Sequence, residues 1–166
     1  MAGFTIAVLV RNQPGVLNRV TSMFRRRRFN INSLTVSETE SNAYSRITIT
    51  SNGEDYVKDQ LINQLYKLPD VNFIKELDEK KSVSRELLLI KMEKSEQTYD
   101  RIIACADEFA ACAVDNAEKS VILQITGNTE QIDAFIKRMK EFKILEICRT
   151  GVVSLERGAE TIRQEE

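Results

Sequence analysis

The residues best suited to chemistry lie near the start of the chain, from Asn12 to Leu17, in the sequence Asn-Gln-Pro-Gly-Val-Leu. This sequence predicts a turn that runs into a helix. The first N–H groups of a helix have no intrahelical acceptor and carry a partial positive charge, so they stabilise a carboxylate. Gly15 has no side chain, so a ligand can approach the main chain closely there, and Pro14 stiffens the loop.

A second polar position, Asn30, comes shortly after the predicted helix. Asn12 and Asn30 each offer an amide oxygen to an ammonium group. Val16 and Leu17 supply an apolar wall. A carboxylate, an ammonium group and a small apolar side chain together describe a small amino acid. The spacing alone leaves a simpler interpretation open, because Asn-x-Pro-Gly is also the sequence of an ordinary turn.

The elements that position these residues follow from hydrophobic periodicity. Residues 3–11 alternate and predict a strand. The helix that follows is expected to have Asn12 or Gln13 as its cap and Pro14 in its first turn, and to end around Arg25–Arg28. Residues 30–38 predict an extended segment. The helix turns one apolar face inward, made of Val16, Val20, Met23 and Phe24.

The same order of elements occurs twice along the chain. The remaining predicted strands are 44–51, 71–77, 83–93, 112–116, 120–127 and 144–150, and the remaining predicted helices are 54–68, 96–109 and 129–140. Two β-α-β-β-α-β units indicate an α+β fold of two ferredoxin-like sandwiches with antiparallel sheets. We therefore expect a first domain over residues 1–78, a linker over 79–82, a second domain over 83–150, and a polar tail over 151–166.

Each predicted sheet has helices on one face only, so its other face needs a cover. Two domains or two chains can cover each other, which leads us to expect at least a homodimer.

The composition excludes several classes of function. The chain has no histidine, which removes His-dependent triads and His metal sites, and its carboxylates form no catalytic pattern. A net charge of −1 gives no general attraction to nucleic acid. Neither a membrane-spanning run nor a signal peptide is evident, so a cytoplasmic protein is expected. Three cysteines, Cys105, Cys112 and Cys148, lie in apolar surroundings and are expected to be buried thiols without metal.

Four consecutive arginines, Arg25 to Arg28, are the most concentrated charge in the sequence. Cations at a helix C-terminus interact favourably with the helix dipole while remaining in solvent. A contact with a protein partner or an anion is the alternative interpretation. Phe29, directly after the arginines, is expected in the core.

Several stretches of the sequence resemble a known protein family. The stretches 8–20 (VLVRNQPGVLNRV) and 29–36 (FNINSLTV) resemble an ACT domain. Further stretches in the second half resemble the small regulatory subunit of acetolactate synthase, also called acetohydroxyacid synthase. They are Arg85–Leu87, Leu89–Lys91, Thr126–Asn128, Ile132–Phe135, Arg149–Val153 and Arg157–Gly158. The resemblance extends over residues 3–158.

This resemblance implies a non-catalytic subunit of a transferase in the biosynthesis of valine, isoleucine and leucine. Such a subunit activates a catalytic (large) subunit and confers feedback inhibition by valine. The cofactors (thiamine diphosphate, Mg²⁺ and FAD) belong to that catalytic partner and none to this chain. Valine is expected between two ACT domains of a homodimer. One chain would contribute Asn12, Pro14, Gly15, Val16 and Leu17, and the other Asn30 and Ile31.

An alternative within the same fold is a free-standing ACT-type amino-acid sensor that regulates another enzyme or a transcription factor. The sequence also departs from the family at two positions. Arg28 stands where the family often has a glycine in the left-handed conformation, and Asn18 stands where it often has serine.

Overall fold

The alternating and helical patterns of the sequence form two compact units of the expected kind. A computed structural model describes residues 3–163, so the outermost residues of the predicted first domain and of the predicted tail lie outside the described residues. Unit 1 comprises residues 1–84 and 152–166, and unit 2 comprises residues 85–151. Unit 1 is therefore built from two separate stretches of the chain.

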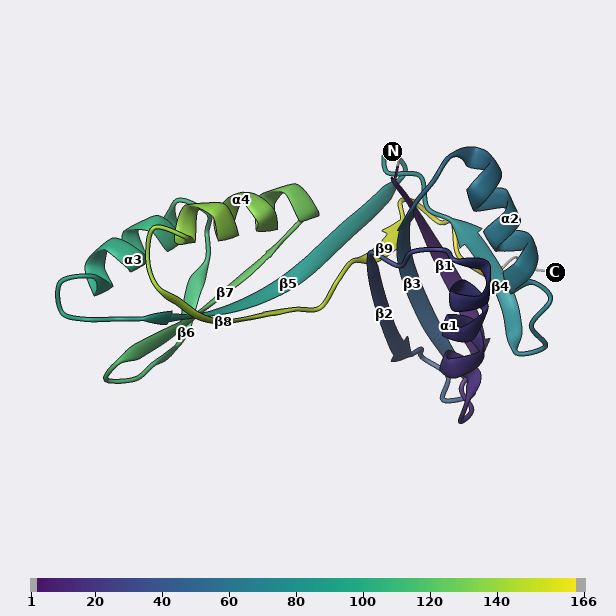
Figure 1. The fold of residues 1–166 in the computed structure, drawn as a ribbon, viewed down its shortest axis with the longest axis horizontal. Helices are drawn as coiled ribbons and strands as arrows, with labels where there is room; N and C mark the ends of the chain where they lie inside the picture. Colours follow the sequence, from purple (N-terminus) through teal and green to yellow (C-terminus); the bar gives the residue numbers. More distant parts are fainter. Residues whose placement is uncertain (1–2, 164–166) are drawn as a thin grey trace. The chain divides into compact units, whose positions relative to one another are not determined.

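Unit 1 has the predicted β-α-β-β-α-β order (Figure 1). Its elements are β1 (Gly3–Arg11), α1 (Val16–Arg27), β2 (Ser33–Glu38), β3 (Tyr44–Asn52), α2 (Asp55–Leu65) and β4 (Val71–Glu76). The strands form an antiparallel sheet in the order β2-β3-β1-β4. Helix α2 ends at Leu65, earlier than predicted, because the chain turns before Pro69.

One face of this sheet forms the core of unit 1 with the two helices. Alternate residues of β1, among them Ile6 and Val8, point to this face and are fully buried. The helices bury residues three and four positions apart against them, as the periodicity predicts. The fully or nearly buried helix residues are Val16, Val20, Met23 and Phe24 of α1 and Leu61 and Leu65 of α2. Phe29 packs edge-on against Phe24 at the border of this core, as expected.

The opposite face of the same sheet is also buried. Ala7 and Leu9 on β1 are 0% and 2% exposed, and Thr48 on β3 is 3% exposed. The cover comes from the C-terminal segment, which contains strand β9 (Val153–Glu156) and pairs with the beginning of β5. The stretch that we expected to be a tail therefore includes an ordered strand, and in unit 1 this segment takes the place that we had assigned to a second domain or a second chain.

Side-chain contacts hold the C-terminal segment against this face. The Arg46 guanidinium donates to the carbonyl oxygen of Ser154 at 2.8 Å, and Lys75 forms an ion pair with Glu156. Burial lowers the pKa of Arg46, and attraction from Glu156 opposes that shift. Ser154 is 4% exposed, so the segment forms a third layer of unit 1.

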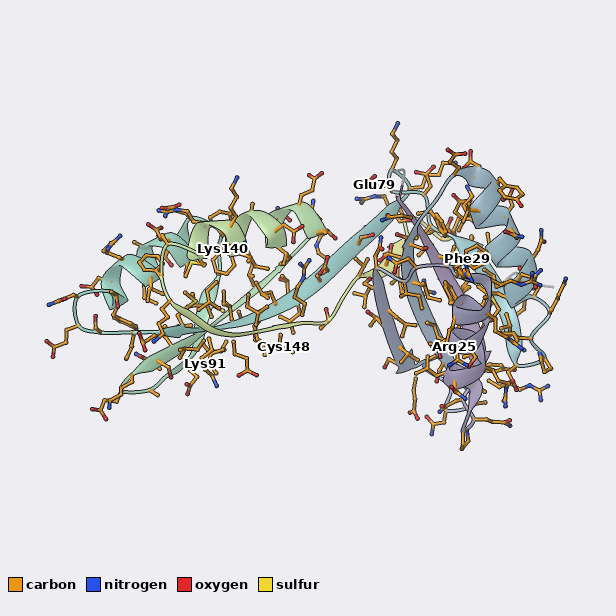
Figure 2. All side chains as sticks on the ribbon, viewed as in Figure 1. Arg25, Phe29, Glu79, Lys91, Lys140 and Cys148 are labelled. Atoms are coloured by element: carbon orange, nitrogen blue, oxygen red, sulfur yellow. The ribbon has the colours of Figure 1, made fainter. Side chains whose placement is uncertain are left out.

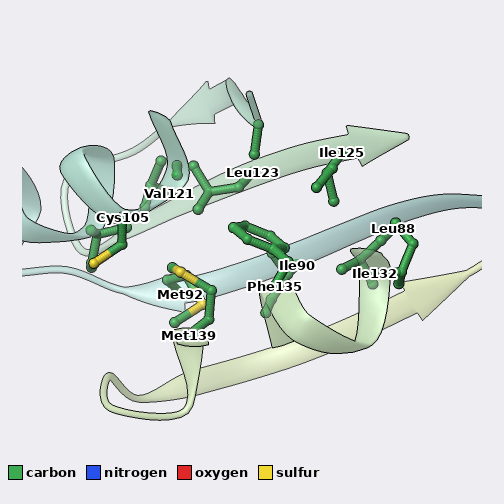
Figure 3. Packing of buried hydrophobic residues seen from close by; sticks show 13 residues of the cluster. Leu88, Ile90, Met92, Cys105, Val121, Leu123, Ile125, Ile132, Phe135 and Met139 are labelled. Carbon is green, nitrogen blue, oxygen red and sulfur yellow. The ribbon is translucent and has the colours of Figure 1, made fainter. Parts of the chain in front are cut away.

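Unit 2 repeats the fold with its own core. Its elements are β5 (Ser82–Glu93, which begins in unit 1), α3 (Tyr99–Asp107), β6 (Cys112–Asn116), β7 (Ser120–Gly127), α4 (Thr129–Met139) and β8 (Ile144–Arg149). The strand order is β6-β7-β5-β8. Figure 3 shows the side chains of β5 and β7 packed against those of α3 and α4, with Phe135 and Met139 fully buried among them.

The cysteine prediction was correct for Cys105, which is buried, and wrong for Cys112 and Cys148, which are exposed. Cys148 pairs across the sheet with Leu89, whose neighbours Leu88 and Ile90 point into the core. Successive residues of a strand point to opposite faces, so Leu89 and Cys148 share the face without helices. Apolar neighbours in the sequence therefore did not mean burial. Figure 2 labels Cys148 on its strand.

Candidate functional site

The loop from Asn12 to Leu17 joins strand β1 to helix α1. Pro14 and Gly15 form a turn, and the helix begins at Val16. Gly15 is the N-cap residue, with φ 86°, and no side chain caps the helix. The prediction that Asn12 or Gln13 caps the helix, and that Pro14 lies in its first turn, was wrong because the left-handed turn at Gly15 delays the helix start. The first turn also contains no acidic residue.

The start of α1 is therefore open to an anion. The N–H of Val16 donates to the carbonyl oxygen of Gln13 at 3.3 Å. The following N–H groups of the first turn donate to no capping side chain. Val16 is 3% exposed and belongs to the core, so only its main chain can contact a ligand. Leu17 is 39% exposed and can provide an apolar surface.

Asn12 anchors this loop to the far end of strand β2. Its side-chain N–H group donates to Glu38 at 2.9 Å and to the carbonyl oxygen of Asn42 at 3.0 Å. Its main-chain N–H donates to Ala43 at 2.8 Å. The amide N–H group is thus used within the chain, which leaves the amide oxygen for an external donor.

The segment with Asn30 and Ile31 lies between α1 and β2, which begins at Ser33 and so starts later than the sequence predicts. Arg28 has φ 57° and closes the helix in the left-handed conformation that the family's glycine would adopt. The Asn30 side-chain N–H group donates to Asn32 at 2.8 Å, and the main-chain carbonyl oxygen of Asn30 accepts from the Ser51 hydroxyl at 2.5 Å. Ile31 is half-buried at the edge of the core.

The two groups of predicted site residues lie at opposite ends of β2 in one chain. Asn12 contacts Glu38, the last residue of β2, whereas Asn30 shortly precedes the beginning of β2, where Ser33 pairs with Thr50. A strand of this length separates its ends by about 20 Å. The structure therefore brings together Asn12, Pro14, Gly15, Val16 and Leu17 in one loop, and Asn30 with Ile31 in a second place.

Strand β2 is also an edge of the sheet within the described part of unit 1, since its neighbour on one side is β3 and it has none on the other. An exposed edge presents unpaired N–H and C=O groups that can bond a further strand. Val36 of β2 is 41% exposed.

Sequence reasoning missed one residue of this region, Arg19. Its Nε lies 2.7 Å from Oδ2 of Asp70, and its guanidinium lies beside the turn at Gly15. The available signal was spacing, because residue 19 is one helical turn after residue 15 and shares its side of the helix.

No group of His, Cys, Asp or Glu among residues 3–163 could hold a metal ion. No helix in that range is long and apolar enough to span a membrane.

Comparisons with known proteins match both units to the same protein family. Residues 6–73 match the family model of the AHAS small subunit-like ACT domain, and residues 85–158 match that of the small subunit of acetolactate synthase. The chain belongs to the acetolactate synthase small-subunit family. It is a non-catalytic regulatory subunit.

Relatives of this family match over nearly the whole chain. A probable acetolactate synthase small subunit of Archaeoglobus fulgidus is 45% identical, over 93% of this chain and 96% of the relative. The acetolactate synthase small subunit of Mycolicibacterium smegmatis is 44% identical, over 93% of this chain and 91% of the relative. The crystal structure of the acetolactate synthase small subunit from Thermotoga maritima superposes with a TM-score of 0.89 at 33% identity, covering 96% of this chain and 100% of that one. As a small subunit, the chain associates with a large catalytic subunit.

Proposed function

We propose that this regulatory subunit activates its thiamine-diphosphate-dependent catalytic partner and confers feedback inhibition by valine. Valine would bind between two copies of unit 1, at a site that neither copy contains alone. Thiamine diphosphate, Mg²⁺ and FAD would be held by the catalytic partner.

The observation that supports this site is the separation of its two halves along β2. If the β2 strands of two copies pair antiparallel, the end of one strand lies next to the beginning of the other. Asn12 to Leu17 of one copy would then approach Asn30 and Ile31 of its partner. Because both faces of the sheet of unit 1 are covered, the β2 edge is the natural surface for a homodimer.

Each half would recognise a different part of the amino acid. The uncapped start of α1 would stabilise the carboxylate. The free amide oxygens of Asn12 and Asn30 would accept from the ammonium group, and Leu17 and Ile31 would contact the side chain. A ligand that contacts both copies stabilises the arrangement in which both halves meet, and this is how it could change the activity of a bound partner.

Subunit mixing tests the shared site. Gly15→Asp damages one half and Asn30→Ala damages the other, so each variant alone should lose valine inhibition of the holoenzyme. A mixed dimer of the two contains one site with both halves intact, and mixing should therefore restore part of the inhibition.

The matched control mixes Gly15→Asp with Asn12→Ala. Both changes lie in the same half, so this mixed dimer has no intact site and should remain insensitive. Equal behaviour of the two mixtures would contradict a site shared between chains. Failure of the unaltered chain to raise the rate of the catalytic subunit at any ratio would contradict the regulatory function itself.

A further inference from the structure

We propose that Arg19, held in place by Asp70, binds the carboxylate of the amino-acid effector together with the start of helix α1. This inference rests on the proposed function, because it assigns a residue to that same site. It gives the site a full positive charge, which the helix start and the two asparagines do not provide.

Arg19 is placed by the helix itself. Its main-chain N–H donates to the carbonyl oxygen of Gly15 at 3.0 Å, which is the first helical hydrogen bond of the turn. Its Nη1 lies 3.5 Å from the position where a Cβ on Gly15 would stand. The guanidinium therefore borders the side of Gly15 that carries no side chain, which is the side by which a ligand can approach.

Asp70 fixes the orientation of this guanidinium. It lies in the turn before β4 and is 9% exposed, and its carbonyl oxygen accepts from the N–H of Arg11 at 2.9 Å. Its carboxylate binds Nε of Arg19 at 2.7 Å. Because only the Nε side is used among residues 3–163, the two Nη groups of the fork remain for another acceptor, and the Arg19 side chain is 47% exposed.

The neighbouring groups also favour an anion at this point. No acidic residue lies in the first turn of α1, and no side chain caps it. A carboxylate placed beside Gly15 could accept from the first-turn N–H groups and from the Nη groups of Arg19 at the same time. Hydrogen bonds in which donor and acceptor are both ionised are among the strongest that proteins form. Asp70 would act as a positioning residue, since it contacts Arg19 and not the ligand.

The test compares valine with valinamide, which lacks the carboxylate but keeps the ammonium group and the side chain. Both are titrated by calorimetry against the full-length subunit. The variant Arg19→Gln/Asp70→Asn removes the guanidinium and also neutralises Asp70, so that no buried charge is left unpaired. It should bind valine roughly tenfold to a hundredfold more weakly, whereas its affinity for valinamide should change less than about twofold.

Two single variants sharpen this result. Arg19→Lys keeps the charge but cannot bind Asp70 and a carboxylate as a fork, so it should lose nearly as much valine affinity as the double variant. Asp70→Asn keeps the shape of the positioning residue and should lose less. Asp55→Asn is the matched control, because it removes the exposed carboxylate of the Lys58 pair in the same unit and should leave valine binding as it was.

An equal loss for valine and valinamide would mean that Arg19 only supports the fold, and it would overturn the inference. Unchanged valine affinity in the double variant would overturn it as well. Absence of valine binding by the unaltered subunit is a different outcome, because it would remove the proposed function on which this inference stands.

Discussion

The two units have the same order of elements and the same strand arrangement, yet they differ at two places that matter for function. In unit 1 the sheet face without helices is covered by the C-terminal segment, and Leu9 on its central strand is 2% exposed. In unit 2 the corresponding face remains accessible among the described residues, and Leu89 on the central strand β5 is 36% exposed. A shared topology therefore does not fix which surfaces of a fold are free.

The second difference lies at the start of the first helix of each unit. Helix α1 has a glycine of positive φ as its N-cap and no acid in its first turn, whereas α3 has Thr98 as its N-cap and Asp100 in its first turn. A carboxylate at the start of α3 would repel an anionic ligand. This difference favours unit 1 over unit 2 as the place of the proposed amino-acid effector.

The largest expected effect comes from removing the C-terminal cover of unit 1, which should destabilise unit 1 and not unit 2. Truncation after Gly151 would expose Ala7, Leu9 and Thr48 and would leave the half-buried Arg46 without its acceptor. We expect unit 1 to lose on the order of 4 kcal/mol, while unit 2 stays folded. Hydrogen exchange followed by mass spectrometry would report the two units separately.

Truncation after Arg157 is the control, because it keeps β9 and removes surface contacts such as the ion pair of Arg163 with Glu40 and the contacts of Lys75 with Glu160 and Thr161. Such pairs contribute little, so protection of unit 1 should change only slightly. A similar loss of protection in both truncated chains would show that β9 is not the cover.

Unit 2 depends instead on an ion pair at the end of its sheet in which the carboxylate is buried and the arginine is partly exposed. Arg149 binds the Glu86 carboxylate at 3.0 and 2.8 Å, and Glu86 is 4% exposed. Arg149→Gln would leave that carboxylate without its cation and should destabilise unit 2 by about 3 kcal/mol. The double variant Arg149→Gln/Glu86→Gln should recover much of this loss in thermal denaturation. No recovery would argue against an unpaired charge as the cause.

Valine inhibition should be sensitive to a negative charge introduced at the start of α1 in unit 1, and insensitive to a change at the start of α3 in unit 2. Gly15→Asp places a carboxylate where we expect that of valine, and Gly15→Asn has the same shape and a similar tolerance of positive φ without the charge. We expect the Asp variant to need roughly a hundredfold more valine than the Asn variant for half-inhibition of the holoenzyme. Inhibition is measured relative to the activity of each variant without valine.

The counterpart in unit 2 is Thr98→Ala, which alters the start of α3 and should leave valine inhibition as it is. Comparable valine sensitivity of Gly15→Asp and Gly15→Asn would contradict the carboxylate position. A loss of inhibition caused by Thr98→Ala would contradict the restriction of the site to unit 1.

The smallest effect concerns a feature that the two units share. The first helix of each is followed within three residues by a non-glycine residue of positive φ, Arg28 at 57° and Ala110 at 55°. In both, the next N–H bonds five residues back, from Phe29 to Phe24 and from Ala111 to Ala106. Arg28→Gly and Ala110→Gly should each stabilise their unit by about 0.5–1 kcal/mol, as measured by denaturant unfolding, because glycine adopts this conformation without strain. Destabilisation by both variants would show that relief of backbone strain does not outweigh the loss of the side chain.

Much of this fold could be predicted from the sequence because its signals are local. Strands β6 and β7 have the predicted limits, and the buried faces of α1 and α4 follow their apolar spacing. The position of Arg28 in the left-handed region also agrees with the glycine that it replaces. These features depend on periods of two or 3.6 residues and on helix ends, which a short stretch of sequence specifies.

What could not be predicted depends on residues far apart in the chain. Strand β9 has only four residues, and the contact of its buried Ser154 with Arg46 of β3 cannot be read from its own pattern. The same holds for the contact between Arg19 and Asp70, which are 51 residues apart, and for the exposure of Cys148. Within the candidate site, the loop and its glycine were predictable, but the helix start was misplaced because a positive φ at Gly15 replaced the expected side-chain cap.

The C-terminal segment returns to unit 1 after unit 2, and this order affects how the protein folds during synthesis. Domains fold from the N-terminus while the chain is being made, yet the third layer of unit 1 is supplied by residues 152–156, after all of unit 2. A nascent chain therefore carries an incomplete first unit throughout the translation of the second. The unit proposed to sense the amino acid would mature last, so interrupted translation products would lack a finished sensor.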